Sequence, residues 1–257
     1  SDVHLNFIQN KEMREEFYFS LLEHSPDIVV ISGDISTSDK VVENLKEMEE
    51  YLKVPVYFVL GNHDFYGSSI RKTKNSVKYL NHLSKSEGVS LSNITKLIGV
   101  EGWGDCRNGD YENSRITMND WLYIDDLRIP YGKGAQELKN KLQRLADSDA
   151  RLLKKRVLKA IKNGFKRIII VSHVPPFKEA CYNAGRKSTP SGLCFFSSRI
   201  LGESVEPIAK QNPNIDFLWI CGHTHNSVTL HVTQNLEIRV AAAEYYCPQI
   251  AGVIEYD

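Results

Sequence analysis

Short apolar runs alternate with segments of helical periodicity along most of the chain. The clearest run covers residues 54–60, is rich in β-branched and aromatic residues, and leads directly into Gly61. An apolar run of this length that ends at a glycine predicts a buried strand followed by a tight turn. The same pattern predicts further strands at residues 27–32, 89–91, 96–100, 167–171, 216–221, 228–233, 237–242 and 250–256.

Helical spacing of apolar residues predicts helices between these strands, with Pro26 ending the first and Gly164 ending the longest. Ser38 is a suitable N-cap for the second. We expect helices over residues 11–24, 38–53, 68–86, 135–163 and 198–211, the fourth being one helix or two joined near residues 147–149. Residues 101–130 and 177–198 show little periodicity, and loops of this length are commonly functional, so we expect them to wall a site.

Nothing in the pattern divides the chain, because no internal repeat, low-complexity tract or linker interrupts it. The alternation of strands and helices therefore predicts one α/β domain over residues 1–257. Residues 1–5 have the character of the end of a strand, so we expect the first strand to lie upstream of Ser1. A signal peptide upstream would be missing for the same reason.

Composition narrows the classes of partner. Lysine plus arginine number 32 and aspartate plus glutamate also 32, so the chain lacks the net charge typical of proteins that bind long nucleic acids or anionic membranes. The basic residues between 151 and 159 are interpreted as a solvated helix face. No apolar segment approaches the ~20 residues needed to span a bilayer. The five cysteines form no C-x-x-C pair, and although Cys181 and Cys194 could pair, we expect reduced thiols and a cytoplasmic protein.

Nitrogen and oxygen donors gather at or beside the predicted strand ends, where open α/β sheets place their ligand sites. Any one of them would be interpreted as a structural or turn residue, as we interpret Asp105 and Asp120, but the repetition favours a metal site. Five of the eight histidines fall in these short segments. The candidate ligands are Asp2, His4, Asp34, Asn62, His173, His223 and His225. Seven donors are too many for one tetrahedral zinc ion but suit two five- or six-coordinate ions that share a carboxylate.

The ordered set Asp2-x-His4, Gly33-Asp34, Gly61-Asn62-His63-Asp64, Ser172-His173 and Gly222-His223-x-His225 resembles the calcineurin-like metallophosphoesterases. The resemblance implies a four-layer αββα sandwich, with two mixed β-sheets flanked by helices and the metal site at the carboxyl ends of the strands. It implies that one metal ion is held by Asp2, His4, Asp34 and His225. By the same likeness, Asp34 bridges to a second ion that Asn62, His173 and His223 complete. His63 would be the proton donor, with Asp64 behind it.

The sequence departs from two branches of that family. The protein phosphatases follow the second block with aspartate, arginine and glycine, whereas here Gly33-Asp34 leads into Ile35-Ser36-Thr37-Ser38. No metal-binding tyrosine follows Asp34 as in the purple acid phosphatases. Neither of those activities is expected.

The resemblance and the donor set together predict a phosphoester hydrolase in which a hydroxide activated by two metal ions attacks phosphorus. The expected ions are Mn²⁺, Fe²⁺ or Fe³⁺, or Zn²⁺, and the expected substrate is a small phosphorylated molecule or a nucleotide. A phosphodiesterase or nuclease of the same fold is an alternative, and a non-catalytic protein-binding scaffold is a less favoured one. Basic side chains in the two loops are expected to meet a second anionic group of the substrate, namely Arg107, Lys178, Arg186 and Arg199.

Overall fold

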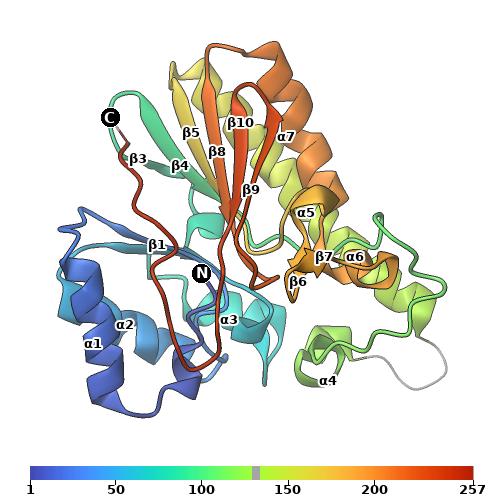
Figure 1. Ribbon diagram of the computed structural model, residues 1–257, viewed down its shortest axis with the longest axis horizontal. Helices are drawn as coiled ribbons and strands as arrows, with labels where there is room; N and C mark the ends of the chain where they lie inside the picture. Colours follow the sequence, from blue (N-terminus) through green and yellow to red (C-terminus); the bar gives the residue numbers. More distant parts are fainter. Residues whose placement is uncertain (129–133, 257) are drawn as a thin grey trace.

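The computed structural model describes residues 1–128 and 134–256, and its strands form a six-stranded sheet, a two-stranded sheet and a small hairpin (Figure 1). The strands are β1 (Val29–Ser32), β2 (Val56–Val59), β3 (Val89–Ser90), β4 (Thr95–Gly99), β5 (Arg167–Val171), β6 (Tyr182–Asn183), β7 (Arg186–Lys187), β8 (Asp216–Cys221), β9 (Val228–Thr233) and β10 (Leu236–Val240). The large sheet has the order β3-β4-β5-β8-β10-β9; its central strands are parallel and its two edge strands antiparallel to their neighbours. Strands β1 and β2 form a parallel pair, and β6 and β7 form the hairpin.

Helices cover the outer faces of both main sheets (Figure 1). They are α1 (Lys11–Leu22), α2 (Val41–Leu52), α3 (Ile70–Ser76), α4 (Asp120–Tyr123), α5 (Ala135–Lys162), α6 (Pro190–Phe196) and α7 (Arg199–Gln211). Short 3₁₀ turns are η1 (Leu5–Phe7), η2 (His63–Phe65), η3 (Leu83–Lys85), η4 (Asp125–Leu127) and η5 (Lys178–Ala180). The region from residue 135 to residue 162 is one continuous helix.

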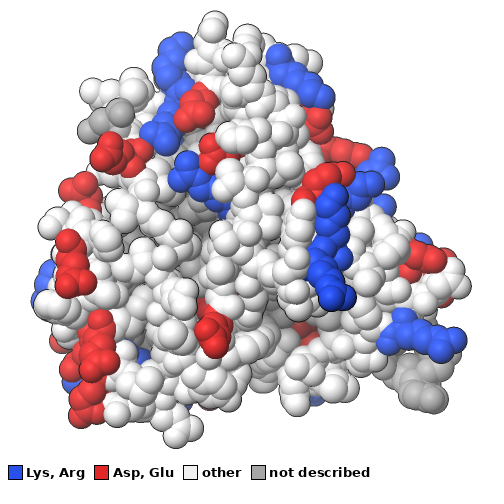
Figure 2. Space-filling model, viewed as in Figure 1, with Lys and Arg blue, Asp and Glu red and all other residues white. Residues whose placement is uncertain are grey.

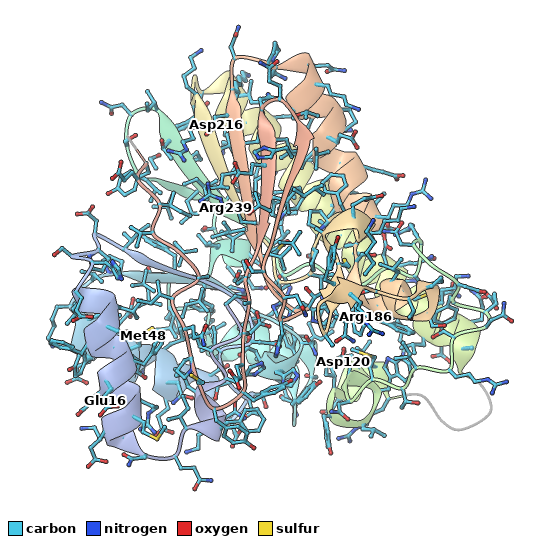
Figure 3. All side chains as sticks on the ribbon, in the orientation of Figure 1. Glu16, Met48, Asp120, Arg186, Asp216 and Arg239 are labelled. Carbon is cyan, nitrogen blue, oxygen red and sulfur yellow. The ribbon has the colours of Figure 1, made fainter. Side chains whose placement is uncertain are left out.

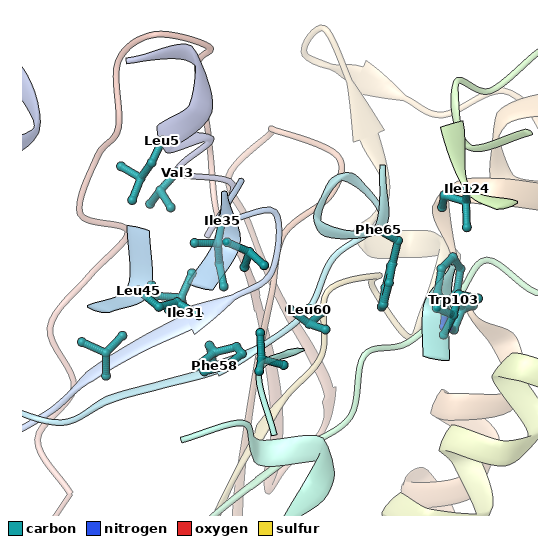
Figure 4. Close-up of a cluster of buried hydrophobic side chains, with 14 of the residues drawn as sticks. Val3, Leu5, Ile31, Ile35, Leu45, Phe58, Leu60, Phe65, Trp103 and Ile124 are labelled. Carbon is teal, nitrogen blue, oxygen red and sulfur yellow. The ribbon is translucent and has the colours of Figure 1, made fainter. Parts of the chain in front are cut away.

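The layers follow from the alternation of side chains along the buried strands. In β5, Ile168 and Ile170 pack among α5 and α7, whereas Ile169 and Val171 face the other way and join Val59 of β2. The outer face of the β1–β2 sheet packs on α1 and α2 in a third apolar cluster, part of which Figure 4 shows. The order is therefore helices, small sheet, large sheet, helices, which confirms the predicted four-layer α/β sandwich. The large sheet is mixed, and the small one consists of the parallel pair alone.

The predicted helix over residues 68–86 is wrong in its second half, because α3 ends at Ser76. The chain then turns so that His82 bridges to Phe58 of β2, with the two rings stacked 5.2 Å apart. Glu101 accepts a 2.7 Å hydrogen bond from the buried His82. These contacts with distant residues outweigh the helical propensity of the segment.

Four smaller predictions also differ from the structure. Residues 250–256 form no strand and are held by side chains, since Arg167 donates to the carbonyl of Glu255 over 2.6 Å. Ser38 is not the N-cap of α2; its hydroxyl donates to the carbonyl of Tyr66 over 2.7 Å. Helix α6 lies in the predicted loop 177–198, capped by the Thr189 hydroxyl at 3.3 Å from the Gly192 nitrogen. The predicted irregular stretch 101–130 contains α4 and η4, and its last two positions lie outside the described residues.

Cys181 and Cys194 are buried free thiols. None of the helices in the described part of the chain is both long and apolar enough to cross a membrane. A cavity of about 620 Å³ lies between β1 and the segment 249–256, and none of the seven candidate ligands lines it.

Candidate metal centre

Four strands and the N-terminal segment bring the candidate ligands together. Asp34 follows β1, Asn62 follows β2 and His173 follows β5, each within a few residues of the strand end. His223 and His225 follow β8 in the same way. The segment containing Asp2 and His4 joins them through backbone hydrogen bonds, with the Asp2 nitrogen 2.9 Å from the Gly33 oxygen and the His4 nitrogen 3.0 Å from the Asp34 oxygen.

The backbone at this centre has an unusual conformation. Ten non-glycine residues in the described part of the chain have positive φ, and half of them are candidate ligands. These are Asp2 (φ 51°), His4 (42°), Asp34 (53°), His223 (69°) and His225 (55°). Each left-handed residue costs roughly 1–2 kcal/mol, although aspartate and histidine tolerate the conformation better than branched residues do. Such strain concentrates at functional sites because the surrounding structure must enforce it.

The side chain of His173 is the centre of one group of ligands. Its Nδ1 lies 2.9 Å from the Ser32 carbonyl oxygen and donates to it. Its Nε2 has three neighbours: Asn62 Oδ1 at 3.0 Å, His223 Nδ1 at 3.2 Å and Asp34 Oδ1 at 3.3 Å. With Nδ1 protonated, a neutral His173 presents a lone pair to the oxygens of Asn62 and Asp34, which are acceptors. A proton or a metal ion must therefore lie between these atoms.

A second group of ligands surrounds Asp2 and His4. His225 Nε2 lies 3.4 Å from Asp2 Oδ1 and 3.5 Å from His4 Nε2. Asp2, His4 and His225 have ligand atoms within 4.8 Å of one another, as do Asp2, Asp34 and His173. Asp34 also lies 3.8 Å from His4 Nε2, so its two oxygens face the two groups. The donor set therefore fits two cations that share Asp34.

Asn62 is held with its oxygen toward His173. Its Nδ2 donates to Asp120 Oδ1 over 2.8 Å, and the same oxygen accepts from the Tyr66 hydroxyl over 2.7 Å. An amide with its nitrogen on a carboxylate must present its oxygen to the other side. Asp120 was expected to be a turn residue, and the structure instead makes it the group that orients Asn62. Asp120 lies 54 residues after Tyr66 in the chain, so no local pattern in the sequence indicates this contact.

The sequence model for calcineurin-like phosphoesterases matches residues 1–227. The chain belongs to that family. Among solved structures, the phosphoesterase is similar to a phosphopantetheinyl hydrolase of Mycobacterium tuberculosis, with a TM-score of 0.61, 14% identity, and 95% of this chain and 87% of that chain covered. It is also similar to a dimetal phosphatase of Danio rerio, with a TM-score of 0.57, 13% identity, and 90% and 77% covered. No curated protein matches the chain. Family membership supports metal-dependent phosphoester hydrolysis and implies two divalent metal ions.

His63 lies at the centre without the close contacts of the other histidines. Its Nε2 is 4.0 Å from Asp34 Oδ2, and its ring stacks on Tyr66 at 4.4 Å between centroids. The His63 backbone nitrogen donates to Asp34 Oδ1 over 2.9 Å, which fixes the residue against the shared carboxylate. The imidazole therefore lies beside the shared carboxylate and the His4 ring, 4.7 Å between centroids, and its side chain is 17% exposed.

Asp64 has a different role from the one expected. Its Oδ1 accepts from the backbone nitrogens of Ile35 and Ser36 at 2.9 and 2.8 Å, and its Oδ2 from that of Gly61 at 2.8 Å. Both carboxylate oxygens are occupied by backbone, and among the described residues no hydrogen bond joins Asp64 to the His63 imidazole. Asp64 connects the loop after β1 to the loop after β2, which positions Asp34 rather than His63.

The four predicted substrate-binding cations differ in their surroundings. Arg107 is 3.2 Å from Asp105 and 2.7 Å from Asp147, and Arg199 is 2.6 Å from Glu203. Lys178 lies 4.0 Å from Glu179 on the surface. Arg186 projects from β7, and the neighbouring Gly185 nitrogen donates to Asn226, next to His225, over 2.8 Å (Figure 3). Arg107 and Arg199 thus have carboxylate partners, and the hairpin that carries Arg186 is attached to the segment that follows His225.

Residues from both predicted loops line a cavity of about 20 Å³ beside His173 and His223. The walls include Trp103, Met118 and Trp121 from the first loop and Phe195 from the second. Asp105, also in the first loop, does not line this cavity. It is fully buried and accepts a hydrogen bond from the Ile200 nitrogen over 2.9 Å, so it is a structural residue. The apolar character of the walls differs from the charged walls that the sequence suggested.

Replacing Asp64 with asparagine tests its role between the loops. Asp64→Asn would turn an NH₂ group toward backbone donors, and leaving a buried donor without an acceptor costs about 1–3 kcal/mol. We expect a free energy of unfolding lower by about 2 kcal/mol or more, measured by denaturant titration. Asp39→Asn, an exposed carboxylate bonded to Thr37, is the control. Unchanged stability would show that the three backbone contacts are not important.

Metal binding must compete with a proton on His173. Burial lowers the pKa of this imidazole, but the adjacent Asp34 carboxylate outweighs burial and raises it to about 9. Burial lowers the pKa of His4 to about 4 and that of His223 to about 3, so both are neutral at pH 7. Below pH 9 the metal-free His173 is protonated, and ligation requires the neutral form.

We therefore expect the affinity for metal to rise about tenfold per pH unit between pH 7 and 9 and to level off above. Calorimetric titration of metal-free protein in buffers of different ionisation enthalpy measures the proton released. His24→Ala, which removes an exposed histidine, should leave that release unchanged. An affinity that is flat across this range would contradict the assignment of the proton to His173.

Proposed function

We propose that the chain hydrolyses phosphoesters of small phosphorylated molecules or nucleotides, with two bound metal ions and with His63 as the proton donor. The observation that carries the proposal is the convergence of the Asn62 and Asp34 oxygens on His173 Nε2, because only a proton or a metal ion can hold these atoms together. The same arrangement extends through Asp34 to the group around Asp2 and His4. A metal ion bound here would replace the proton that otherwise compensates the repulsion between these atoms.

The roles of the seven ligands follow from their grouping. Asp2, His4 and His225 would hold one ion, Asn62, His173 and His223 the other, and Asp34 both. When bound, the two ions supply an activated water and positive charge for the phosphoryl oxygens. The protein keeps the geometry fixed: Asp120 and Tyr66 orient Asn62, and the Ser32 carbonyl orients His173. Such partners set ligand orientation and metal affinity in general.

His63 has the position that a proton donor requires. It lies beside the shared carboxylate, its ring is supported by stacking on Tyr66, and part of its side chain is open to solvent. A donor must reach the leaving oxygen while the ligands hold the rest of the phosphoryl group. His63 has a ligand atom within 4.8 Å of those of His4 and Asp34, and the assignment of the seven other residues to the ions leaves it available to donate a proton.

The surroundings support a small substrate. On the face in Figure 2, basic and acidic side chains are interspersed, with no field of one sign that would attract a long polyanion. Of the four predicted cations, Arg186 belongs to the β6–β7 hairpin, whose Gly185 donates to Asn226 beside His225. Attraction of one phosphoryl group by the bound ions does not need further cations.

The function is tested by assaying protein loaded with Mn²⁺, Fe²⁺, Co²⁺ or Zn²⁺ on phosphomonoesters and phosphodiesters. We expect hydrolysis that chelation abolishes and a divalent ion restores. Asp34→Asn should lower metal content and activity more than any other ligand change, because Asp34 faces both groups. Asp39→Asn, in the same loop but exposed, is the control. Full activity of metal-free protein would refute the proposal.

The role of His63 is tested with two leaving groups. General acids contribute about 10²–10⁴-fold when the leaving oxygen is strongly basic, as an alkoxide is, and much less for a nitrophenolate. We expect His63→Ala to keep its metal, to lose at least about 10²-fold in kcat on alkyl esters, and to lose much less on nitrophenyl esters. His24→Ala serves as a control, and metal content is measured in parallel. An equal loss on both esters would mean that His63 stabilises phosphoryl charge instead.

A further inference from the structure

A continuous series of aromatic contacts crosses the metal centre. It joins Tyr246 to Phe7 at 5.3 Å, Phe7 to Tyr245 at 5.3 Å, Tyr245 to His4 at 4.7 Å, His4 to His63 at 4.7 Å, His63 to Tyr66 at 4.4 Å and Tyr66 to Tyr123 at 5.4 Å. The middle rings belong to the centre already described. The first three form a separate cluster on one side of it, and we call Phe7, Tyr245 and Tyr246 the aromatic platform.

The aromatic platform is attached to the centre and open to solvent. The Tyr245 ring packs on His4 at 4.7 Å and on His225 at 5.0 Å, the two histidines of one ligand group. Yet Tyr245 is 42% exposed and Tyr246 is 63% exposed. Ring faces that belonged to the core would be buried, as Phe58 and Phe65 are. The platform therefore presents aromatic surface beside the position of the phosphoryl group.

Backbone conformation gives a second, independent observation. Tyr246 has a φ of 67°, a left-handed conformation that is rare for a bulky residue. No large buried area compensates for this strain, because the Tyr246 side chain is mostly exposed. The strain instead serves to place its ring against Phe7, at 5.3 Å and an interplanar angle of 53°. Backbone strain clusters at active sites and ligand contacts, so the conformation of Tyr246 agrees with a ligand-binding role for the aromatic platform.

We infer that the aromatic platform binds a planar heteroaromatic group of the substrate, so that the substrate is a nucleotide whose base stacks on Tyr245 and Tyr246. The inference rests on the proposed function for the place of the phosphate. A nucleobase offers a π-face to any exposed aromatic ring, and stacking on protein aromatics is strong and tolerant of base identity. It requires no charged partner, which agrees with the ion pairs that occupy Arg107 and Arg199.

A matched pair of ligands isolates the contribution of the base. The non-hydrolysable methylene phosphonate analogues of AMP and of ribose 5-phosphate carry the same phosphonate and sugar, and only the first carries adenine. Their dissociation constants for metal-loaded protein are measured by calorimetry, which works whether or not the protein turns over any ester. We expect the adenosine analogue to bind about tenfold or more tightly than the ribose analogue.

Variants then assign this difference to the platform. Tyr245→Leu and Tyr246→Leu keep apolar bulk but remove the π-face, and together they should reduce the ratio to near one. Tyr245→Phe and Tyr246→Phe should keep it, and they remain informative if a leucine variant does not fold. Tyr79→Leu, at a tyrosine that is 86% exposed, is the control. Metal content and circular dichroism confirm that each variant is intact.

The outcomes separate this inference from the function on which it rests. Equal binding of the two analogues, or a preference that survives the double leucine substitution, overturns the inference even if esters are hydrolysed. Tighter binding of phosphocholine than of the adenosine analogue also overturns it, since the platform would then recognise a quaternary ammonium group. A base preference that depends on Tyr245 and Tyr246 supports it, and failure of the proposed function appears separately as absence of metal-dependent hydrolysis.

Discussion

The repulsion between acceptor atoms around Asp34 is the constraint on which the rest of the centre depends. Carboxylate, amide and imidazole lone pairs are buried within hydrogen-bond distance of one another, and a proton or a metal ion must lie between them. The loops that hold them are packed without room for side chains. A Cβ on Gly61 would lie 2.2 Å from Asp34 Oδ1, and one on Gly33 would lie 2.6 Å from His173 Nδ1. These two glycines allow the backbone to approach the side chains of Asp34 and His173 closely.

The parts of the fold that the sequence predicts well are those that local patterns encode. Apolar runs such as residues 167–171 predicted the strands, and the glycine and histidine residues at their ends indicated the candidate ligands, which the folded chain brings together. The order of the layers was implied by the family resemblance rather than by the apolar runs. Where the prediction from the sequence is wrong, contacts between residues distant in the chain determine the local structure. His82 interrupts the helix predicted over residues 68–86 because it stacks on Phe58 and bonds to Glu101.

The same distinction separates the ligands from the residues that support them. Asp64 adjoins His63 in the sequence, which suggested that it orients the imidazole, yet its oxygens bind three backbone nitrogens. Asp120 and Tyr245 lie far from the motifs in sequence, and only the folded chain brings them to Asn62 and His4. Arg107 and Arg199 looked available to a substrate because a sequence does not show which carboxylates lie nearby. Helix α6 was the avoidable omission, since Thr189 followed by Pro190 is a common start of a helix.

The left-handed backbone at five of the ligands limits how this centre can be transferred to another protein. An engineer who copied only the side chains onto regular strands or helices would place each donor on a backbone that points it elsewhere. The unit that carries the chemistry is therefore the set of loops, with their backbone shape and the neighbours that enforce it. Amino-acid substitutions at these positions within the family should be limited in the same way. A β-branched replacement at such a position would lose the donor and also destabilise the loop, so the tolerated alternatives are the few residues that accept a positive φ.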